Sequence, residues 1–191
     1  MLARMGAVIQ FEERAVARLR ERIAAAEEAN QDLIAFARGH SGAVASIHQA
    51  VLAAIAADNL EHLFHIVTQE WPLILRIDAV SLALIVGDQG FRADANGVQR
   101  VEPQIVARAM EQVDGVVLRA VGRGHPLFGS ACELIRAEAL IRVDGEAPLP
   151  CGLIALGQRT GQSLDTRHGS ELLMFLGVSL GAMIRRWLTE N

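Results

Sequence analysis

The stretch AVSLALIVGDQG, residues 79–90, decides how this sequence folds. Its first eight residues are almost entirely apolar and include β-branched members, which is typical of a buried strand. The turn formers Gly87-Asp88-Gln89-Gly90 follow at once and predict a hairpin that continues toward residues 91–95. This stretch therefore predicts the start of a β-sheet.

Further strands are predicted toward the carboxyl end. Residues 116–121 are apolar, residues 139–143 alternate between two faces, and residues 152–156 form another apolar run. Asp144-Gly145 supplies turn chemistry, so the last two of these strands are predicted to pair antiparallel. Residues 102–112 predict a helix, because Pro103 stands in a first-turn position.

Helices are predicted on both sides of these strands in the sequence. Residues 44–55 carry an apolar stripe, and Asp58 and Asn59 are capping residues for another helix that Pro72 ends or kinks. A last helix runs from about Thr166 to Leu188 and is apolar nearly all round. Its extra apolar surface implies a second cover, most simply the same helix of another subunit. The order predicts an α+β fold, an antiparallel sheet backed by terminal helices.

The amino-terminal part predicts a long coiled-coil helix. Apolar residues recur there with a seven-residue spacing, and Asn30 falls at an a position, where a buried amide favours two strands. Gly39, Ser41 and Gly42 break the pattern. We therefore predict a coiled-coil helix over residues 1–40 and one domain over residues 41–191. A lone helix that folds back on its own domain is the alternative.

The composition excludes several classes of function. The net charge of −4 offers no basic footprint for nucleic acid. All 18 cationic side chains are arginine, so Schiff-base catalysis and a Walker A loop, which need lysine, are excluded. No signal peptide or membrane-spanning stretch is recognisable, and two cysteines are too few for a disulfide scaffold. We expect a cytoplasmic protein that binds neither nucleic acid nor membranes.

Short motifs along the chain carry a family resemblance. They are GAV (residues 6–8), RLRERI (18–23), LFG (127–129), AEAL (137–140), GLIALG (152–157) and FLG (175–177). Together with the predicted order of elements, they resemble the GAF fold, and more closely a bacterial family of unassigned function that joins a coiled-coil helix to a GAF-like domain. The resemblance implies the fold and dimerisation, and it implies no activity.

The GAF resemblance also implies where a ligand would bind. In that superfamily the pocket lies between the sheet and the loops opposite the terminal helices, which here implies residues 122–136. Polar groups and one aromatic wall make this segment the candidate ligand site: Arg123, His125, Phe128, Ser130, Cys132, Glu133 and Arg136. The alternative is a polar surface loop with Phe128 filling the core.

No catalytic, metal or cofactor site is predicted. One GAF branch reduces free methionine sulfoxide with cysteines, but Cys151 lies in an apolar strand that disfavours a reactive thiolate. His62 and His65 point away from the apolar face of their helix, and a third metal ligand is missing. The cyclic-nucleotide signature needs lysine, and the bilin signature needs a Cys-His pair, so both ligands are disfavoured.

Three functions follow from these observations. The first is a homodimeric, non-catalytic regulatory module that binds an unidentified small molecule and signals to a separate protein. The second is a structural adaptor without a ligand, and the third is a thiol-dependent methionine sulfoxide reductase. The residues predicted to form the dimer are Val16, Leu19, Ile23, Asn30 and Leu33 of the coiled coil and Leu176, Leu180 and Met183 of the last helix.

Overall fold

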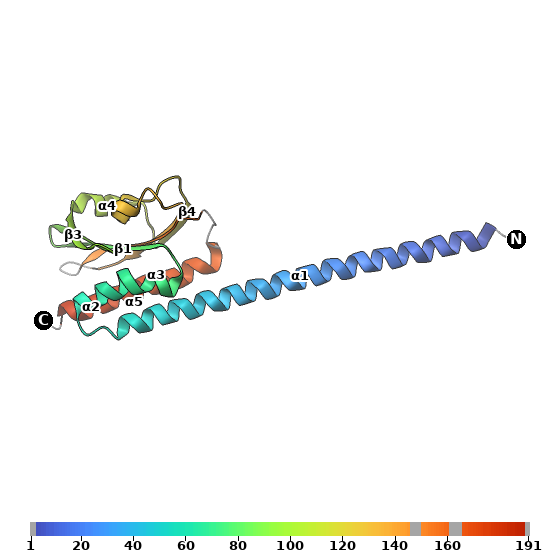
Figure 1. Ribbon diagram of the computed structural model, residues 1–191, viewed down its shortest axis with the longest axis horizontal. Coiled ribbons are helices and arrows are strands. Elements are labelled where there is room, and N and C mark those ends of the chain that lie inside the picture. Colours follow the sequence, from blue (N-terminus) through green and yellow to red (C-terminus); the bar gives the residue numbers. More distant parts are fainter. Residues whose placement is uncertain (1–2, 146–149, 161–165, 190–191) are drawn as a thin grey trace. The chain divides into compact units, whose positions relative to one another are not determined.

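The computed structural model describes residues 3–145, 150–160 and 166–189 (Figure 1). The chain divides into two compact units, residues 1–42 and residues 43–191. The first unit is helical and belongs to α1, which spans Ala3–Ile55. Val16 and Ile23 are 45% and 57% exposed there. Among the described residues, no helix has the length and apolarity that crossing a membrane requires.

The predicted helix break at residues 39–42 is wrong, because α1 continues through both glycines. No atom lies within 4 Å of a Cβ placed on Gly39 or Gly42, so neither position depends on a close contact. A glycine costs a helix only about 1 kcal/mol relative to alanine, and no proline follows in α1. The division between the two units therefore lies inside a helix.

The second unit is built on one antiparallel sheet of six strands in the order β3-β2-β1-β6-β5-β4. The predicted hairpin is confirmed: Val86 pairs with Gln89, and Gly87 takes a φ of +64° in the turn between them. The predicted pairing of the last two strands is confirmed as well. The strands are β1 (Ala79–Val86), β2 (Gln89–Asp94), β3 (Gly97–Val101), β4 (Val116–Ala120), β5 (Ala137–Val143) and β6 (Cys151–Gln158).

Three short segments follow Asn59, whose side chain accepts the N–H of His62 and caps α2 as predicted. The helical run continues past Pro72, but it is irregular there. A π-helical turn precedes it, because proline lacks the N–H that a regular α-helical turn requires. The helix then continues to Leu75. The segments are α2 (Leu60–His65), η1 (Ile66–Glu70) and α3 (Trp71–Leu75).

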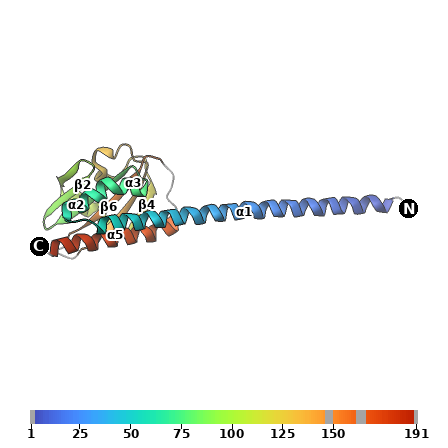
Figure 2. The same cartoon turned by 60° about the horizontal axis from the view of Figure 1, so that its bottom comes forward.

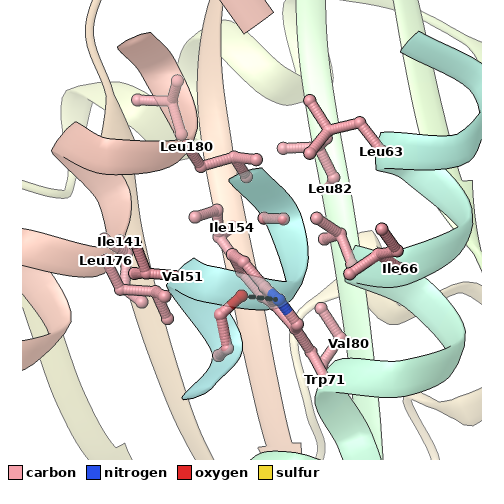
Figure 3. Close-up of a cluster of buried hydrophobic side chains, with 14 of the residues drawn as sticks. Val51, Leu63, Ile66, Trp71, Val80, Leu82, Ile141, Ile154, Leu176 and Leu180 are labelled. Atoms are coloured by element: carbon pink, nitrogen blue, oxygen red, sulfur yellow. Dashed lines mark hydrogen bonds between the residues drawn. The ribbon is translucent and has the colours of Figure 1, made fainter. Parts of the chain in front are cut away.

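One face of the sheet packs against the end of α1, the segments α2 to α3, and α5 (Thr166–Thr189). Figure 2 turns this face forward, with α2, α3 and α5 in front of the strands. Trp71 is 1% exposed and donates its indole N–H to the carbonyl of Ala50 at 2.9 Å. The same bond appears in Figure 3 among the aliphatic side chains of the strands and of α5. This cluster forms the larger part of the core.

The opposite face is covered by α4 (Pro103–Glu111), which matches the predicted helix, and by the 3₁₀ helix η2 (Pro126–Ala131). The sheet is therefore buried on both faces. This explains why β1 and β6 are apolar at nearly every position instead of alternating. The face that carries α4 and η2, called here the α4 face, holds the predicted ligand site.

Candidate functional site

The loop between β4 and β5 carries η2 and lies on the α4 face. A buried hydroxyl anchors it, because Ser81 of β1 donates a hydrogen bond to the carbonyl of Leu127 at 2.7 Å. Both ends of the loop continue the strand pairing. Val121 N donates to the Arg136 carbonyl at 2.8 Å beside the β4–β5 pair, and Arg136 N donates to the Gln158 carbonyl at 2.7 Å beside the β5–β6 pair. The loop is therefore tied to the sheet at its middle and at both ends.

The apolar residues of this loop fill the core beneath it. Phe128 is 3% exposed and packs over Gly157 of β6, where an added Cβ would lie 2.8 Å from the ring. Leu127 and Ile135 are also buried, and so is Cys132. The predicted aromatic wall is thus a core side chain, which agrees with the alternative interpretation of Phe128.

The polar residues of the loop bond mainly to the loop itself. Arg123 pairs with Glu133 at 2.7 Å, and both side chains are exposed. Its contact with the thiol of Cys132, and then the charge of Glu133, raise the pKa of Arg123. Arg136 donates to the carbonyls of Glu133 and Ile135, each at 2.8 Å. Ser130 is exposed on the surface. These side chains brace the loop and do not converge on one point.

His125 takes part in a buried network around Glu138, a residue that the sequence analysis did not select. Glu138 is 1% exposed, and its Oε2 accepts the backbone N–H of His125 at 2.7 Å. Its Oε1 pairs with Arg119 of β4 at 2.7 Å. His125 Nδ1 accepts the N–H of Leu127 at 3.2 Å. Burial lowers the pKa of His125, the charge of Glu138 opposes this effect, and Arg119 adds to it.

A second charged group on the α4 face was also missed. Arg92 and Asp94 of β2 lie within ion-pair distance, with Arg92 Nε 3.1 Å from Asp94 Oδ2, under the turn at Gly129. A signal for this pair exists in the sequence, since QGFRAD places two charged residues at alternate positions of an otherwise predicted strand.

The cysteines and histidines assemble no metal site among the described residues. Cys132 and Cys151 are both free thiols, the first in the α4-face cluster and the second packed against it. His62 Nδ1 accepts the N–H of Asp58 at 3.3 Å at the start of α2, so its role there is local.

The predicted dimer residues of α5 need correction. Leu176 and Leu180 are 0% exposed, because they pack on the sheet of their own protomer and offer no surface to a second chain. Met183 is half-buried. The large apolar side chains that α5 does expose are Met174, Phe175, Val178 and Leu188. In the first unit Val16, Ile23 and Asn30 are exposed, and the side chains of Leu19 and Leu33 lie outside the described residues.

Apolar exposure continues from α5 to the neighbouring end of α1. Phe175 is 47% exposed and stacks edge-on against His48, with the ring centres 6.4 Å apart. On α1, Leu52 and Ile55 are 66% and 56% exposed, and on α5 Val178 is 64% exposed. We call these four apolar side chains the helical patch: Leu52, Ile55, Phe175 and Val178.

Comparisons with known proteins agree with this architecture. The family model described as "Protein of unknown function, DUF484" matches residues 2–189. A search among curated proteins finds no match.

Solved structures that resemble the chain are GAF domains and related proteins. The GAF domain of a phosphoenolpyruvate-protein phosphotransferase from Coxiella burnetii is 16% identical, with a TM-score of 0.57 over 79% of this chain and 97% of that one. The free methionine-R-sulfoxide reductase of Neisseria meningitidis, solved with its substrate, is 13% identical, with a TM-score of 0.56 over 76% and 89%. The chromophore-binding domain of a Stigmatella aurantiaca bacteriophytochrome is 14% identical, with a TM-score of 0.51 over 73% and 59%. At these identities the likeness shows the GAF fold and no more.

Proposed function

Since this chain belongs to the DUF484 family and has the fold of a GAF domain, we propose that it is a homodimeric regulatory module. In this proposal it binds a small molecule, performs no catalysis and passes its signal to a separate protein. Two of its structural neighbours hold a small molecule by their names, a chromophore-binding domain of a bacteriophytochrome and a methionine-R-sulfoxide reductase in complex with its substrate, which supports the binding of a small molecule.

The helical patch is the observation that carries the proposal. Four large apolar side chains on two neighbouring helices are each about half exposed or more in the single protomer. Large exposed apolar side chains gathered on neighbouring helices in this way are typical of a protein interface. A second copy covers it most simply, because a two-fold axis brings the same patch of both copies together.

The first unit offers a second contact between the copies. The heptad spacing supplies a seam with Val16, Ile23 and Asn30 exposed in the protomer. In a two-stranded pair these side chains meet their counterparts, and the Asn30 amides hydrogen-bond to each other. The dimer in this proposal is therefore held by the coiled coil and by the helical patch.

A structural adaptor is the second candidate, and the filled α4 face favours it. Leu127, Phe128 and Ile135 occupy the space between the loop and the sheet, each no more than 3% exposed. Such an adaptor binds its partner through its helices and needs no ligand. The two candidates share the dimer and differ in whether a small molecule binds.

Analytical ultracentrifugation of the full chain at micromolar concentration tests the dimer. We expect a species of twice the 20.6 kDa protomer mass. Val178→Glu places a charge in the helical patch and should raise the dissociation constant by at least about tenfold, or about 1.4 kcal/mol. Leu73→Glu is the matched control, since Leu73 is 79% exposed on α3, outside the patch.

Ile23→Asp separates the coiled coil from the patch. We expect it to weaken the dimer independently of Val178→Glu, and the double variant to be a monomer. A wild-type protein that sediments only as the protomer would overturn the proposal. Equal effects of Val178→Glu and Leu73→Glu would remove the patch from the interface.

A further inference from the structure

One ionisable side chain lies beside the helical patch. His48 precedes Leu52 by four residues and Ile55 by seven, so the three side chains lie on one face of α1, and all three are exposed. The end of α1 and α5 lie side by side in Figure 1 and Figure 2. There Phe175 of α5 packs edge-on against the His48 ring, with 6.4 Å between the ring centres. His48 therefore adjoins both the α1 half and the α5 half of the patch.

The sequence of α1 places neither an acid nor an arginine near His48. From residue 39 to residue 57 the chain has two titratable residues, His40 and His48. Arg38 and Asp58 flank this stretch. Within the second unit, His48 is therefore the one titratable residue of α1.

The charged residues of α5 lie on either side of its exposed apolar segment. None occurs between Glu171 and Arg185. Glu171 stands one turn before Phe175 and is exposed, so water and salt screen its charge in the single protomer. A chain that covers the helical patch thus meets apolar and neutral side chains, with the imidazole of His48 as the group that can gain a charge.

Covering the patch takes this imidazole out of water. An apolar partner surface gives an imidazolium neither hydration nor a counter-charge, so burial disfavours the charged form more than the neutral form. The Phe175 ring attracts a cation only weakly, and it does so in the separated protomer as well. Histidine is also the side chain that ordinarily changes its charge between pH 5 and pH 8. The covered patch therefore favours neutral His48.

We propose that His48 makes the dimer pH-sensitive: neutral His48 permits a second copy to cover the helical patch, and protonated His48 opposes it. The inference rests on the proposed function, because it names the regulation of the same interface. Two-fold symmetry brings one His48 from each copy, so two charges oppose the contact at low pH. The separated protomers then bind more protons than the dimer, and linkage requires that the dimer weakens as the pH falls.

Analytical ultracentrifugation of the full chain over a concentration series, at about pH 7.5 and about pH 5.5, tests this inference. We expect the dissociation constant to be at least about tenfold higher at the lower pH, because a tenfold change corresponds to one pH unit of altered proton binding at one site. Far-UV circular dichroism at both pH values separates dissociation from unfolding, since a dissociated protomer keeps its helices.

Variants assign the effect to this histidine. His48→Gln keeps a polar side chain that takes up no proton, so its dissociation constant should be the same at both pH values. His48→Arg carries a permanent charge and should dimerise more weakly than the wild type at about pH 7.5. His65→Gln is the matched control, because His65 is an exposed histidine of α2 outside the helical patch. It should keep the pH dependence of the wild type.

The outcomes separate this inference from the proposed function. A wild-type dimer with the same dissociation constant at both pH values overturns the inference and leaves the dimer standing. A pH dependence that persists in His48→Gln also overturns it and assigns the effect to another group, such as His40. A dimer that tightens at low pH overturns it as well, because the imidazolium would then meet a carboxylate such as that of Glu171. A wild-type protein that is monomeric at both pH values overturns the proposed dimer itself.

Discussion

At the scale of single residues, two glycines share a positive φ but differ in their surroundings. Gly87 in the β1–β2 turn and Gly129 in η2 have φ values of +64° and +57°. No atom lies within 4 Å of a Cβ placed on Gly87, whereas a Cβ on Gly129 would press on the Arg92 guanidinium. Gly129 therefore combines an unusual backbone conformation with crowding, whereas Gly87 has only the positive φ.

Gly129→Ala should destabilise the protein more than Gly87→Ala. A positive φ in a turn costs an alanine about 1–2 kcal/mol, and the ψ of −126° at Gly129 takes that residue outside the left-handed helical region as well. The displaced guanidinium at Gly129 adds about 1 kcal/mol or more, since a buried ion pair loses its geometry. Urea unfolding of the two variants measures the difference. Equal losses of unfolding free energy would contradict the added strain and crowding at Gly129.

His125 predicts a pH dependence of stability. Burial holds its pKa below the ordinary value of 6.5 that applies to the unfolded chain. The unfolded chain therefore binds this proton at a higher pH than the folded chain does, and the stabilisation present above pH 6.5 is lost as the pH falls through the folded pKa. Protonation also removes Nδ1 as the acceptor for the Leu127 N–H.

Urea unfolding at about pH 7.5 and about pH 5.5 tests this prediction. His125→Gln is the comparison, because glutamine keeps an acceptor and does not titrate. The wild type should lose more free energy of unfolding between the two pH values than the variant. The same loss in both proteins would assign the pH dependence to other groups.

At the scale of elements, α1 carries one heptad stripe through its whole length. Val44 and Val51 follow Val16 at whole multiples of seven residues, with no shift of phase at the glycines. In the second unit the stripe is buried in its own core, where Val51 is 8% exposed. In the first unit Val16 and Ile23 are exposed. Two parts of one repeating pattern therefore meet different surroundings, which the pattern itself cannot reveal.

The helical state of residues 39–42 can be tested by glycine replacement. Gly39→Ala and Gly42→Ala should each stabilise α1 by up to about 1 kcal/mol, because alanine is the better helix former and both sites are open. Gly177→Ala is the control, since a Cβ there would lie 2.6 Å from Ile141 Cγ2 and should destabilise the protein. Circular dichroism melting checks all three. A loss of helix in the first two would contradict a continuous α1.

At the scale of the whole molecule, the sheet separates two kinds of surface. On the side that carries α1 and α5, the outer surface holds the exposed helical patch. On the α4 face, the outer surface includes the β4–β5 loop, whose polar groups bond to one another. In the proposed dimer the first side holds the second copy, whereas core side chains fill the space beneath the loop on the α4 face.

The sequence by itself determined most element types, because turn chemistry, capping residues and apolar runs act over a few residues. It predicted β1, β4, β5, β6, α4 and α5, and it identified Asn59 as a cap. It missed β3 (Gly97–Val101), because this strand is short, mostly exposed and without an apolar pattern. It also overestimated the tendency of Gly39 and Gly42 to end the helix.

Only the tertiary structure decided which side chains are left for function. Burial depends on segments that are far apart in the chain, so the apolar pattern of α5 could not tell the buried Leu176 from the exposed Val178. For the same reason, the burial of Glu138 and of the Arg92–Asp94 pair was decided only when the strands were assembled beneath the loop. Local physics selects the elements, and packing between distant elements selects the surfaces that remain to bind.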